Sequence, residues 1–364
     1  MIIMIYQFLQ EKFPTDWLEK FKEISKSFEI LMLQIFSYSG FMSSLYYSFF
    51  SEKFRREHHS VILGRLKYEQ RLKRNQKPRY LLRRNIHRLE KGLLMRPRKD
   101  VFGTLYINET VDAYKNCINS SRMDNGDFDE IQWAHDVLSS YFEVVGSNFG
   151  VDRAKRDFLN INENRLNSKN PSKVPFQRKI ESSPPITIDD FLELAKQRKS
   201  VRWYLNKPVP REDIDKALLA ATLSPSACNR QPYEFRVFDQ PDSVQKIASL
   251  PRGTVGFRGN IPAIVVIIGK LDAFFDERDR HLIYIDASLA AMSFILSLET
   301  LGLSSCALNW PDIKETELKM RDELQLAPNE RVIMLIAFGY PDPEGLVAYS
   351  QKKSLTEIRQ YCST

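Results

Sequence analysis

Two long apolar runs, residues 261–268 and 331–338, constrain the fold of this 364-residue chain more than any other feature. A strand that is apolar on both faces must be covered on both faces, so each run predicts a strand inside a sheet. The stretch 284–301 between them is apolar nearly all round, which predicts a buried central helix. With a further strand predicted at Tyr233–Phe238, the pattern is that of an α+β sandwich whose central sheet is mixed or antiparallel.

A short cationic segment comes before the first of these strands. It follows a predicted helix, Ile188–Gln197, and holds three cations and one hydroxyl within five positions: Arg198, Lys199, Ser200 and Arg202. Arginine offers paired donors to phosphate oxygens, so fixed cations around a hydroxyl suit a phosphate group. Such a segment on its own is more often a solvated face.

A polar loop lies further along the chain, between a predicted helix at Arg211–Thr222 and the strand at Tyr233–Phe238. Prolines at both ends of the loop restrict its backbone, so its amides and side-chain dipoles can be held in place. The residues of interest in it are Pro225, Ser226, Ala227, Asn229 and Gln231. A loop of this composition alone is typical of an ordinary turn.

Together and in this order, the two segments resemble the signature of the nitroreductase-like flavoproteins. That signature reads Arg-x-Ser-x-Arg/Lys, then Pro-Val, then Pro-Ser-x-x-Asn-x-Gln-Pro-aromatic, and Pro208 with Val209 supplies its middle part. Three later segments also match: residues 302–310 resemble the family's strand that leads to a cysteine, 339–341 its Gly-Tyr-Pro turn and 352–358 its closing element. The resemblance covers about 187–364, which it identifies as an FMN-binding domain of this family.

The resemblance implies FMN at the interface of a homodimer, with NADH or NADPH as hydride donor and a small organic molecule as electron acceptor. The cofactor-binding residues that it implies in one subunit are Arg198, Lys199, Ser200, Arg202, Ala307, Leu308, Asn309, Lys352 and Lys353. The second subunit would contribute Pro225, Ser226, Ala227 and Asn229, and Gln231 is a further cofactor-binding residue that the resemblance implies. Lys352 replaces the usual arginine, and either Lys352 or Lys353 is the phosphate ligand. No protein nucleophile or general base is implied.

The preceding half of the chain predicts a mainly helical extension at 1–165, joined by a linker at 166–186 to the domain at 187–364. Pro78 separates two predicted helices, and Leu82, Ile86 and Leu89 recur at helical spacing on one apolar face. Such extensions occur in relatives of the nitroreductase-like family that are associated with bacterial polysaccharide biosynthesis.

A strongly basic segment marks this extension. Residues 65–99 contain fourteen Lys or Arg and two acidic residues, a net charge of +12, whereas the whole chain carries +7. Three alternatives are a solvated or internally ion-paired face, contact with an anionic membrane surface or glycan, and contact with nucleic acid. The interleaved aromatic residues of single-strand binders are missing, which disfavours nucleic acid.

Residues 31–51 carry no charge and are long enough to span a bilayer, but serines, Gln34 and Gly40 interrupt them. They predict a buried or amphipathic helix, with a helix lying on the membrane as the alternative. The apolar residues 1–6 lack the basic start and cleavage site of a signal peptide, so we expect a cytoplasmic protein. The alternative is a cytoplasmic protein that also contacts the membrane surface.

Cysteine and histidine spacing gives no sign of a metal site. The four cysteines and five histidines are scattered, and no Cys-x-x-Cys pair occurs, so we expect neither a metal nor a disulfide framework. Two other functions stay open: a flavin-binding or vestigial scaffold in a membrane or polysaccharide-assembly setting, and another flavin reaction on the same fold, such as dehalogenation. The retained Arg198, Ser200, Asn229 and Gln231 argue against a decayed site.

Overall fold

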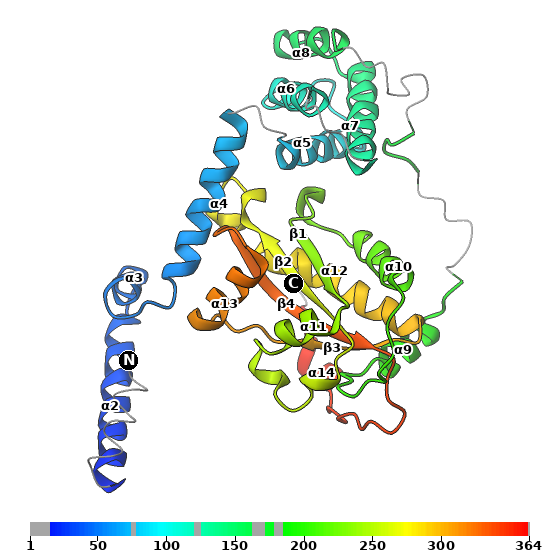
Figure 1. The fold of residues 1–364 in the computed structure, drawn as a ribbon. Coiled ribbons are helices and arrows are strands. Elements are labelled where there is room, and N and C mark those ends of the chain that lie inside the picture. The colour runs from blue at the N-terminus through cyan, green and yellow to red at the C-terminus, as the bar shows by residue number, and fades with distance from the viewer. Residues whose placement is uncertain (1–14, 74–77, 120–124, 162–171, 178–184, 363–364) are drawn as a thin grey trace. The chain divides into compact units, whose positions relative to one another are not determined.

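A computed structural model describes residues 15–73, 78–119, 125–161, 172–177 and 185–362 (Figure 1). Contacts divide the chain into two compact units, Met1–His59 and Ser60–Thr364. Much of the predicted linker at 166–186 lies outside the described residues, so its boundaries stay a prediction.

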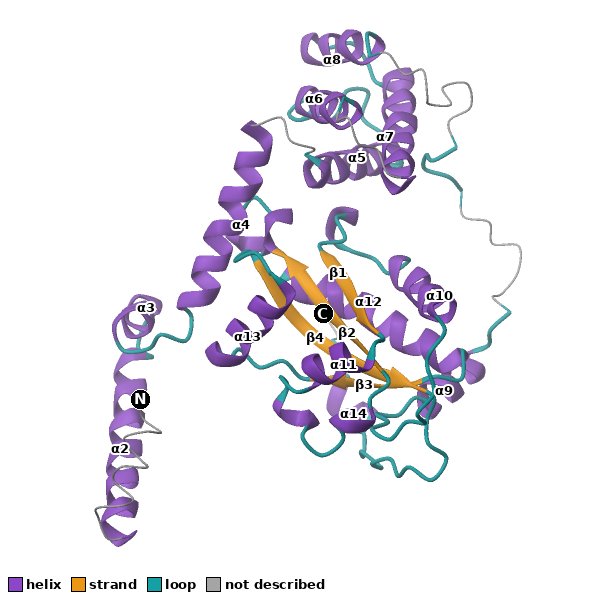
Figure 2. Cartoon of the chain, in the orientation of Figure 1, coloured by secondary structure: helices purple, strands orange, loops and turns teal. Residues whose placement is uncertain are grey.

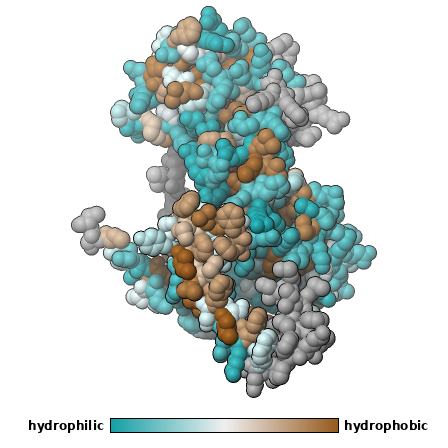
Figure 3. Space-filling model, turned by 90° about the vertical axis from the view of Figure 1, so that its left-hand side faces the viewer, coloured by the Kyte–Doolittle hydropathy of each residue, from teal (hydrophilic) through white to brown (hydrophobic). Residues whose placement is uncertain are grey.

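The first unit consists of α2 (Thr15–Phe36), α3 (Gly40–Phe49) and the start of α4 (Arg55–Lys73). The run 31–51, predicted as a buried or amphipathic helix, is divided between two helices, and the buried alternative is wrong. The chain turns between α2 and α3 because Ser39 caps α3, its hydroxyl accepting the N–H of Met42 at 3.2 Å. Neither helix is buried: α3 has no buried residue, and α2 exposes apolar side chains, among them Trp17, Phe21, Phe28 and Leu31. Hydrophobic residues, drawn brown, gather in the lower half of the face that Figure 3 shows.

Four helices of the second unit pack into a bundle: α5 (Arg79–Leu93), α6 (Ile107–Ile118), α7 (Asn125–Val144) and α8 (Phe149–Leu159). Pro78 directly precedes α5, as predicted. The predicted apolar face of α5 is confirmed, since Leu82, Ile86 and Leu89 are fully buried in the core of the bundle.

The described strands of the second unit form one antiparallel sheet in the order β1-β2-β4-β3 (Figure 2). Their bounds are β1 (Tyr233–Phe238), β2 (Ala263–Lys270), β3 (Ser304–Leu308) and β4 (Glu330–Gly339). Both apolar runs of the sequence are therefore strands, and they lie side by side in the middle of the sheet. The predicted α+β class with a central sheet is confirmed.

Helices cover both faces of this sheet, because successive residues of a strand point to opposite sides. Val265 and Ile267 of β2 belong to the core shared with α10 (Arg211–Thr222) and α12 (Leu282–Thr300). Ile264 and Val266 belong to the core shared with α11 (Pro241–Ala248) and α13 (Lys314–Leu324). This two-sided burial is why the run at 261–268 shows no polar alternation.

Helix α12 packs on the sheet with one side only. Phe294 and Leu298 are fully buried, whereas Ile285, Leu289 and Met292 are 53%, 45% and 44% exposed. Within one chain, the predicted burial of this helix is therefore confirmed for one face, and the other face is open. Among the described residues, 277–300 is also the one helix long and apolar enough to cross a bilayer, but its inner side belongs to the core of the sheet domain.

Candidate functional site

A small cationic pocket of about 90 Å³ lies where the end of α9 (Ile188–Gln197) meets the C-terminal segment. Its lining includes the predicted cationic segment and one of the two predicted lysines: Arg198, Lys199, Ser200, Arg202 and Lys352, with Ala348, Tyr349 and Ser350. Folding therefore brings together groups that lie far apart in the sequence. Four cations and a hydroxyl form a donor set that fits a phosphate.

The cationic segment is held against the edge of the sheet. Ser200 forms a parallel bridge with Ser305 of β3, and the N–H of Val201 donates to the carbonyl of Ser305 at 3.0 Å. The buried hydroxyl of Tyr204 donates to the carbonyl of Val201 at 2.7 Å, and burial raises the pKa of this hydroxyl so that it stays a donor. These contacts fix the backbone that carries the cations.

Burial shifts the pKa of two groups near the pocket, a carboxyl and a thiol. Burial raises the pKa of Glu299, against the opposing effects of a hydrogen bond from Gln197 and the charge of Arg198. Burial likewise raises the pKa of the Cys306 thiol, although Arg202 and Arg198 oppose this shift. Cys306 is therefore a protonated thiol at neutral pH and not a nucleophile.

The two candidate lysines differ in position. Lys352 lines the pocket and Lys353, although exposed, does not. The chain then enters α14 (Leu355–Ile358), which Ser354 caps: its N–H donates to Glu357 Oε2 at 2.8 Å. The geometry thus favours Lys352 as the lysine that meets an anion.

The predicted ring-binding residues of 307–309 follow the same edge strand. Ala307 is exposed, Leu308 is buried and Asn309 is exposed after the strand has ended. They continue β3 beyond the bridge at Ser305, so the backbone at 307–309 is tied to the segment that carries the cations.

The predicted loop at 225–231 has an unusual backbone. Cys228, Asn229 and Gln231 have φ angles of 52°, 52° and 49°. Side chains with a Cβ disfavour this left-handed region, at a cost on the order of 1–3 kcal/mol each, and asparagine tolerates it best. Neighbouring groups must therefore hold the loop in this shape.

Some of that support comes from the sheet domain itself. The N–H of Ala227 donates to Asp286 Oδ2 of α12 at 3.1 Å, and the N–H of Gln231 donates to Ser226 Oγ at 3.1 Å. Burial raises the pKa of Asp286, opposed by the Ala227 hydrogen bond and the charge of Arg230. Arg230 is itself 4% exposed, with its guanidinium 5.0 Å from the ring centre of Phe274, and burial lowers its pKa.

Further support comes from a residue that the sequence did not reveal. Arg83 of α5 donates through Nε to the carbonyl of Asn229 at 2.7 Å and through Nη2 to Gln231 Oε1 at 3.1 Å. Its only sequence signal is membership of the basic segment 65–99.

The two predicted half-sites make different contacts, and no residue of the loop 225–231 is among those that line the cationic pocket. Among the described residues, no hydrogen bond or ion pair connects 198–202 with 225–231. The loop contacts α5 and α12, whereas the cationic segment contacts β3.

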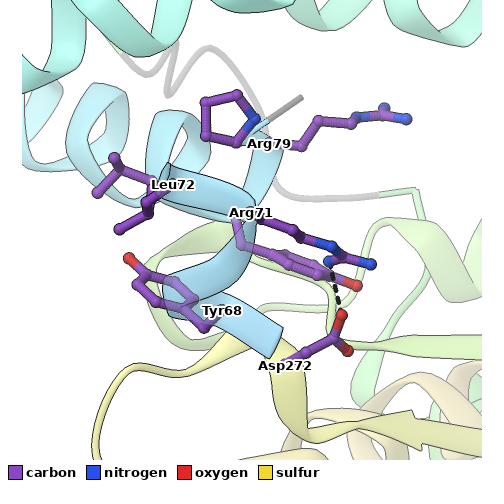
Figure 4. A pocket seen from close by; sticks show the side chains of 8 residues that line it. Tyr68, Arg71, Leu72, Arg79 and Asp272 are labelled. Carbon is purple, nitrogen blue, oxygen red and sulfur yellow. Dashed lines mark ion pairs between the residues drawn. The ribbon is translucent and has the colours of Figure 1, made fainter. Parts of the chain in front are cut away.

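A second hollow lies between α4 and α5 and has a volume of about 10 Å³, room for about one water. Figure 4 shows Arg71 reaching the carboxylate of Asp272 across it, beside Tyr68 and Leu72. This ion pair connects two parts of the fold and offers no space for an organic ligand. In the part of the chain that the structure describes, no group of three or more His, Cys, Asp or Glu could hold a metal ion.

Comparisons with known proteins cover the half that holds this site. The description "Nitroreductase family" matches residues 195–255 and 249–340. A Methanothermobacter thermautotrophicus protein with the provisional name NADH dehydrogenase/NAD(P)H nitroreductase is 30% identical over 159 residues, 42% of this chain and 78% of that protein.

Other relatives match the same region. Iodotyrosine deiodinase 1 of Sus scrofa is 25% identical over 215 residues, 51% of this chain and 73% of that protein. A solved structure of an FMN-dependent nitroreductase from Clostridium difficile is 27% identical and covers 47% of this chain and 99% of that chain, with a TM-score of 0.41. The family match and the Methanothermobacter relative together show that this chain, through its C-terminal half, belongs to the nitroreductase family of oxidoreductases.

Proposed function

We propose that the protein is an FMN-dependent oxidoreductase that passes hydride from NADH or NADPH to a small organic acceptor. The observation that carries this proposal is the pocket in which Arg198, Ser200 and Lys352 converge. It is supported by relatives named as NAD(P)H nitroreductases and by one named as FMN-dependent.

The residues of the chain would bind and orient the cofactor. Arg198 and Lys352 would pair with the phosphate, and the hydroxyl of Ser200 would donate to it. Arg202, next along the segment, would hold negative charge at the pyrimidine end of the ring, and backbone amides at 307–309 would donate to its edge. When bound, FMN supplies the hydride chemistry through its N5 atom, and the protein supplies position and electrostatics.

We also propose that two copies complete the site. A pocket of about 90 Å³ suits a phosphate, whereas sites for drug-sized ligands are typically roughly 300–1,000 Å³. The ring would then be enclosed by the loop at 225–231 of a second subunit. The contacting helices α10 and α12 both carry exposed apolar side chains, with Leu219 65% and Leu223 81% exposed on or beside α10.

A second candidate reaction is reductive dehalogenation on the same flavin. Several relatives are named iodotyrosine deiodinase, including the Sus scrofa protein. Both reactions use the same cofactor site, so the acceptor distinguishes them. A vestigial scaffold in a membrane or polysaccharide-assembly setting is a third candidate, and it predicts no turnover.

The absorbance spectrum of the purified full-length protein tests the proposal. We expect a visible flavin band that releases FMN on denaturation and bleaches with NADH or NADPH without oxygen. Reoxidation by a nitroaromatic compound, and not by a halogenated tyrosine, supports the first candidate, and the reverse supports the second. Protein produced with ample riboflavin that neither carries nor binds flavin would contradict both and favour the scaffold.

A further inference from the structure

We propose that Arg83 of the helical bundle is a positioning residue that clamps the loop 226–231, so that the extension controls how well the flavin domain holds its cofactor. This inference rests on the proposed function, since the loop is one of the two predicted parts of the flavin site. It gives the basic helix α5 a role inside the molecule.

The guanidinium of Arg83 spans the strained part of the loop. Its Nε lies 2.7 Å from the carbonyl oxygen of Asn229, and its Nη2 lies 3.1 Å from Oε1 of Gln231. Both residues have left-handed φ angles, and Arg83 binds them from one planar group. A lysine has a point charge without this fork, so it cannot reproduce both contacts in the same geometry.

The bundle in turn holds Arg83. Its Nη1 lies 3.1 Å from Oε2 of Glu130, a carboxylate that is 5% exposed, and its guanidinium lies 5.5 Å from the ring centre of Trp133. The indole N–H of Trp133 donates to Glu90 at 2.9 Å. The Arg83 side chain is 16% exposed, so little freedom is left to it.

Through Arg83, the packed bundle restricts the backbone conformation of the loop. Three left-handed residues without glycine do not keep this shape through local preference, because αL is unfavourable for most L-residues. Asp286 accepts a hydrogen bond from the N–H of Ala227, and Ser226 accepts one from the N–H of Gln231. Arg83 supplies the contact at the carbonyl of Asn229, which no other described group bonds. Without it, we expect the loop to populate other conformations and the flavin site to lose preorganisation.

The test compares three variants of the full-length protein in a Cys362→Ser background. Arg83→Ala removes the clamp, Arg83→Lys keeps a cation beside Glu130, and Arg88→Ala is the matched control on the same helix. Arg88 bonds Asn85 at 3.2 Å and stacks 3.6 Å from the ring centre of Tyr106, both within the bundle.

Two measurements test the effect of the clamp on the loop separately from its effect on FMN binding. The first is the dissociation constant of FMN, which we expect Arg83→Ala to raise about tenfold, the effect of losing one charge-assisted hydrogen bond. The second is the alkylation rate of Cys228 in apoprotein, which reports loop opening without flavin. Cys117 and Cys306 are buried, so Cys228 is the reporter once Cys362 is replaced.

The clamp predicts faster Cys228 alkylation and weaker FMN binding in both Arg83→Ala and Arg83→Lys, because neither side chain makes both contacts, and wild-type behaviour in Arg88→Ala. Unchanged alkylation in Arg83→Ala, or equal changes in Arg83→Ala and Arg88→Ala, overturns the inference. If the parent protein binds no FMN but the alkylation pattern holds, the proposed function fails while the clamp stands.

Discussion

The guanidinium of Arg71 lies 2.6 Å from the carboxylate of Asp272, whose side chain is 2% exposed. Lys67 lies 3.8 Å from the same carboxylate, and Asn329 donates to its other oxygen at 2.9 Å. Part of the basic segment 65–99 therefore neutralises a buried acid just after β2. Internal ion pairing, one of the alternatives for this segment, is confirmed at this position.

Replacing Arg71 by alanine should lower the free energy of unfolding by roughly 1–3 kcal/mol, because Asp272 stays buried with only the more distant Lys67 to compensate its charge. Arg211→Ala is the matched control. Arg211 pairs with Asp239 at 2.6 Å, but its side chain is 76% exposed, so solvent screens this pair and the loss should be clearly smaller. Urea unfolding of both variants measures the difference, and equal losses would contradict the prediction.

Replacing Arg198 by alanine should weaken FMN binding by roughly 1.5–3 kcal/mol, the range for a hydrogen bond to a charged group. Lys352→Ala should act in the same direction, whereas Lys353→Ala should have little effect because Lys353 does not line the pocket. Titration of apoprotein with FMN measures these losses.

Riboflavin, which lacks the phosphate, is the control ligand, and its affinity should not change in the Arg198 and Lys352 variants. Lys196→Ala is the control variant, since Lys196 pairs with Glu193 on the exposed side of α9. If Arg198→Ala binds FMN as tightly as the parent protein, the phosphate is not held at this pocket.

Replacing Asp286 by asparagine should raise the melting temperature at neutral pH. Burial raises the folded-state pKa of Asp286, so its contribution to stability is fully present below its unfolded-state pKa and is lost as pH rises through the folded-state value. The amide cannot ionise and avoids that loss. The gain should therefore shrink toward zero below a pH of about 4, near the ordinary pKa of aspartate.

Asp190→Asn should change the melting temperature at neutral pH in the opposite direction. Hydrogen bonds from Thr187 lower the pKa of Asp190, so its contribution to stability is present above the unfolded-state pKa and is lost as pH falls through the folded-state value. This variant should melt below the parent at neutral pH and approach it in acid. A pair of scanning calorimetry series across pH checks both, and parallel shifts of the two variants would count against the assignment.

The sequence located the elements with strong local signals. The bounds of α9, α10 and β1 agree with the prediction because their ends are marked locally: Thr187 and Asp190 form a capping box, and Pro210 precedes α10. Short α11 and α13 were not predicted as separate helices. The break at Ser39 was missed because a single capping serine looks like any other serine in an uncharged run.

Contacts between residues far apart in the chain were harder to predict from the sequence. A helix as apolar as α12 shows no sign of which face the fold leaves exposed, so Ile285 and Leu289 could not be told from Phe294. The contact between Arg83 and Asn229 joins residues distant in the chain, and nothing in the spacing of the basic segment predicts it. The motif residues of the pocket were predicted through family resemblance, which already encodes such distant contacts.

The exposed remainder of the basic segment should bind anionic lipid. Lys91, Arg96, Arg98 and Lys99 are exposed, beside Leu94 and Met95, which are 52% and 50% exposed. Cosedimentation should show full-length protein on phosphatidylserine vesicles at low salt and not on phosphatidylcholine vesicles. A variant with Arg96, Arg98 and Lys99 changed to alanine should lose about 1 kcal/mol for each charge.

Retention on an anionic glycan but not on the vesicles would assign the same charges to a different partner. If the full-length protein shows no salt-sensitive retention on either, these charged side chains form only a solvated face.

The last prediction is a homodimer whose assembly and FMN occupancy rise and fall together. In the described chain the loop at 225–231 does not line the cationic pocket, and α10 and α12 expose Leu219 and Ile285. Changing both to glutamate should yield a monomer that holds FMN poorly, because a buried charge on each side opposes an apolar interface.

Leu159→Glu is the matched control, since Leu159 ends α8 in the bundle and is 70% exposed. Light scattering and flavin absorbance, followed on one dilution series, measure subunit association and occupancy in the same sample. The parent and the control should lose FMN only as the dimer fraction falls. A monomer that still holds one FMN per chain would show that a single chain completes the site, which would leave the exposed faces of α10 and α12 without this role.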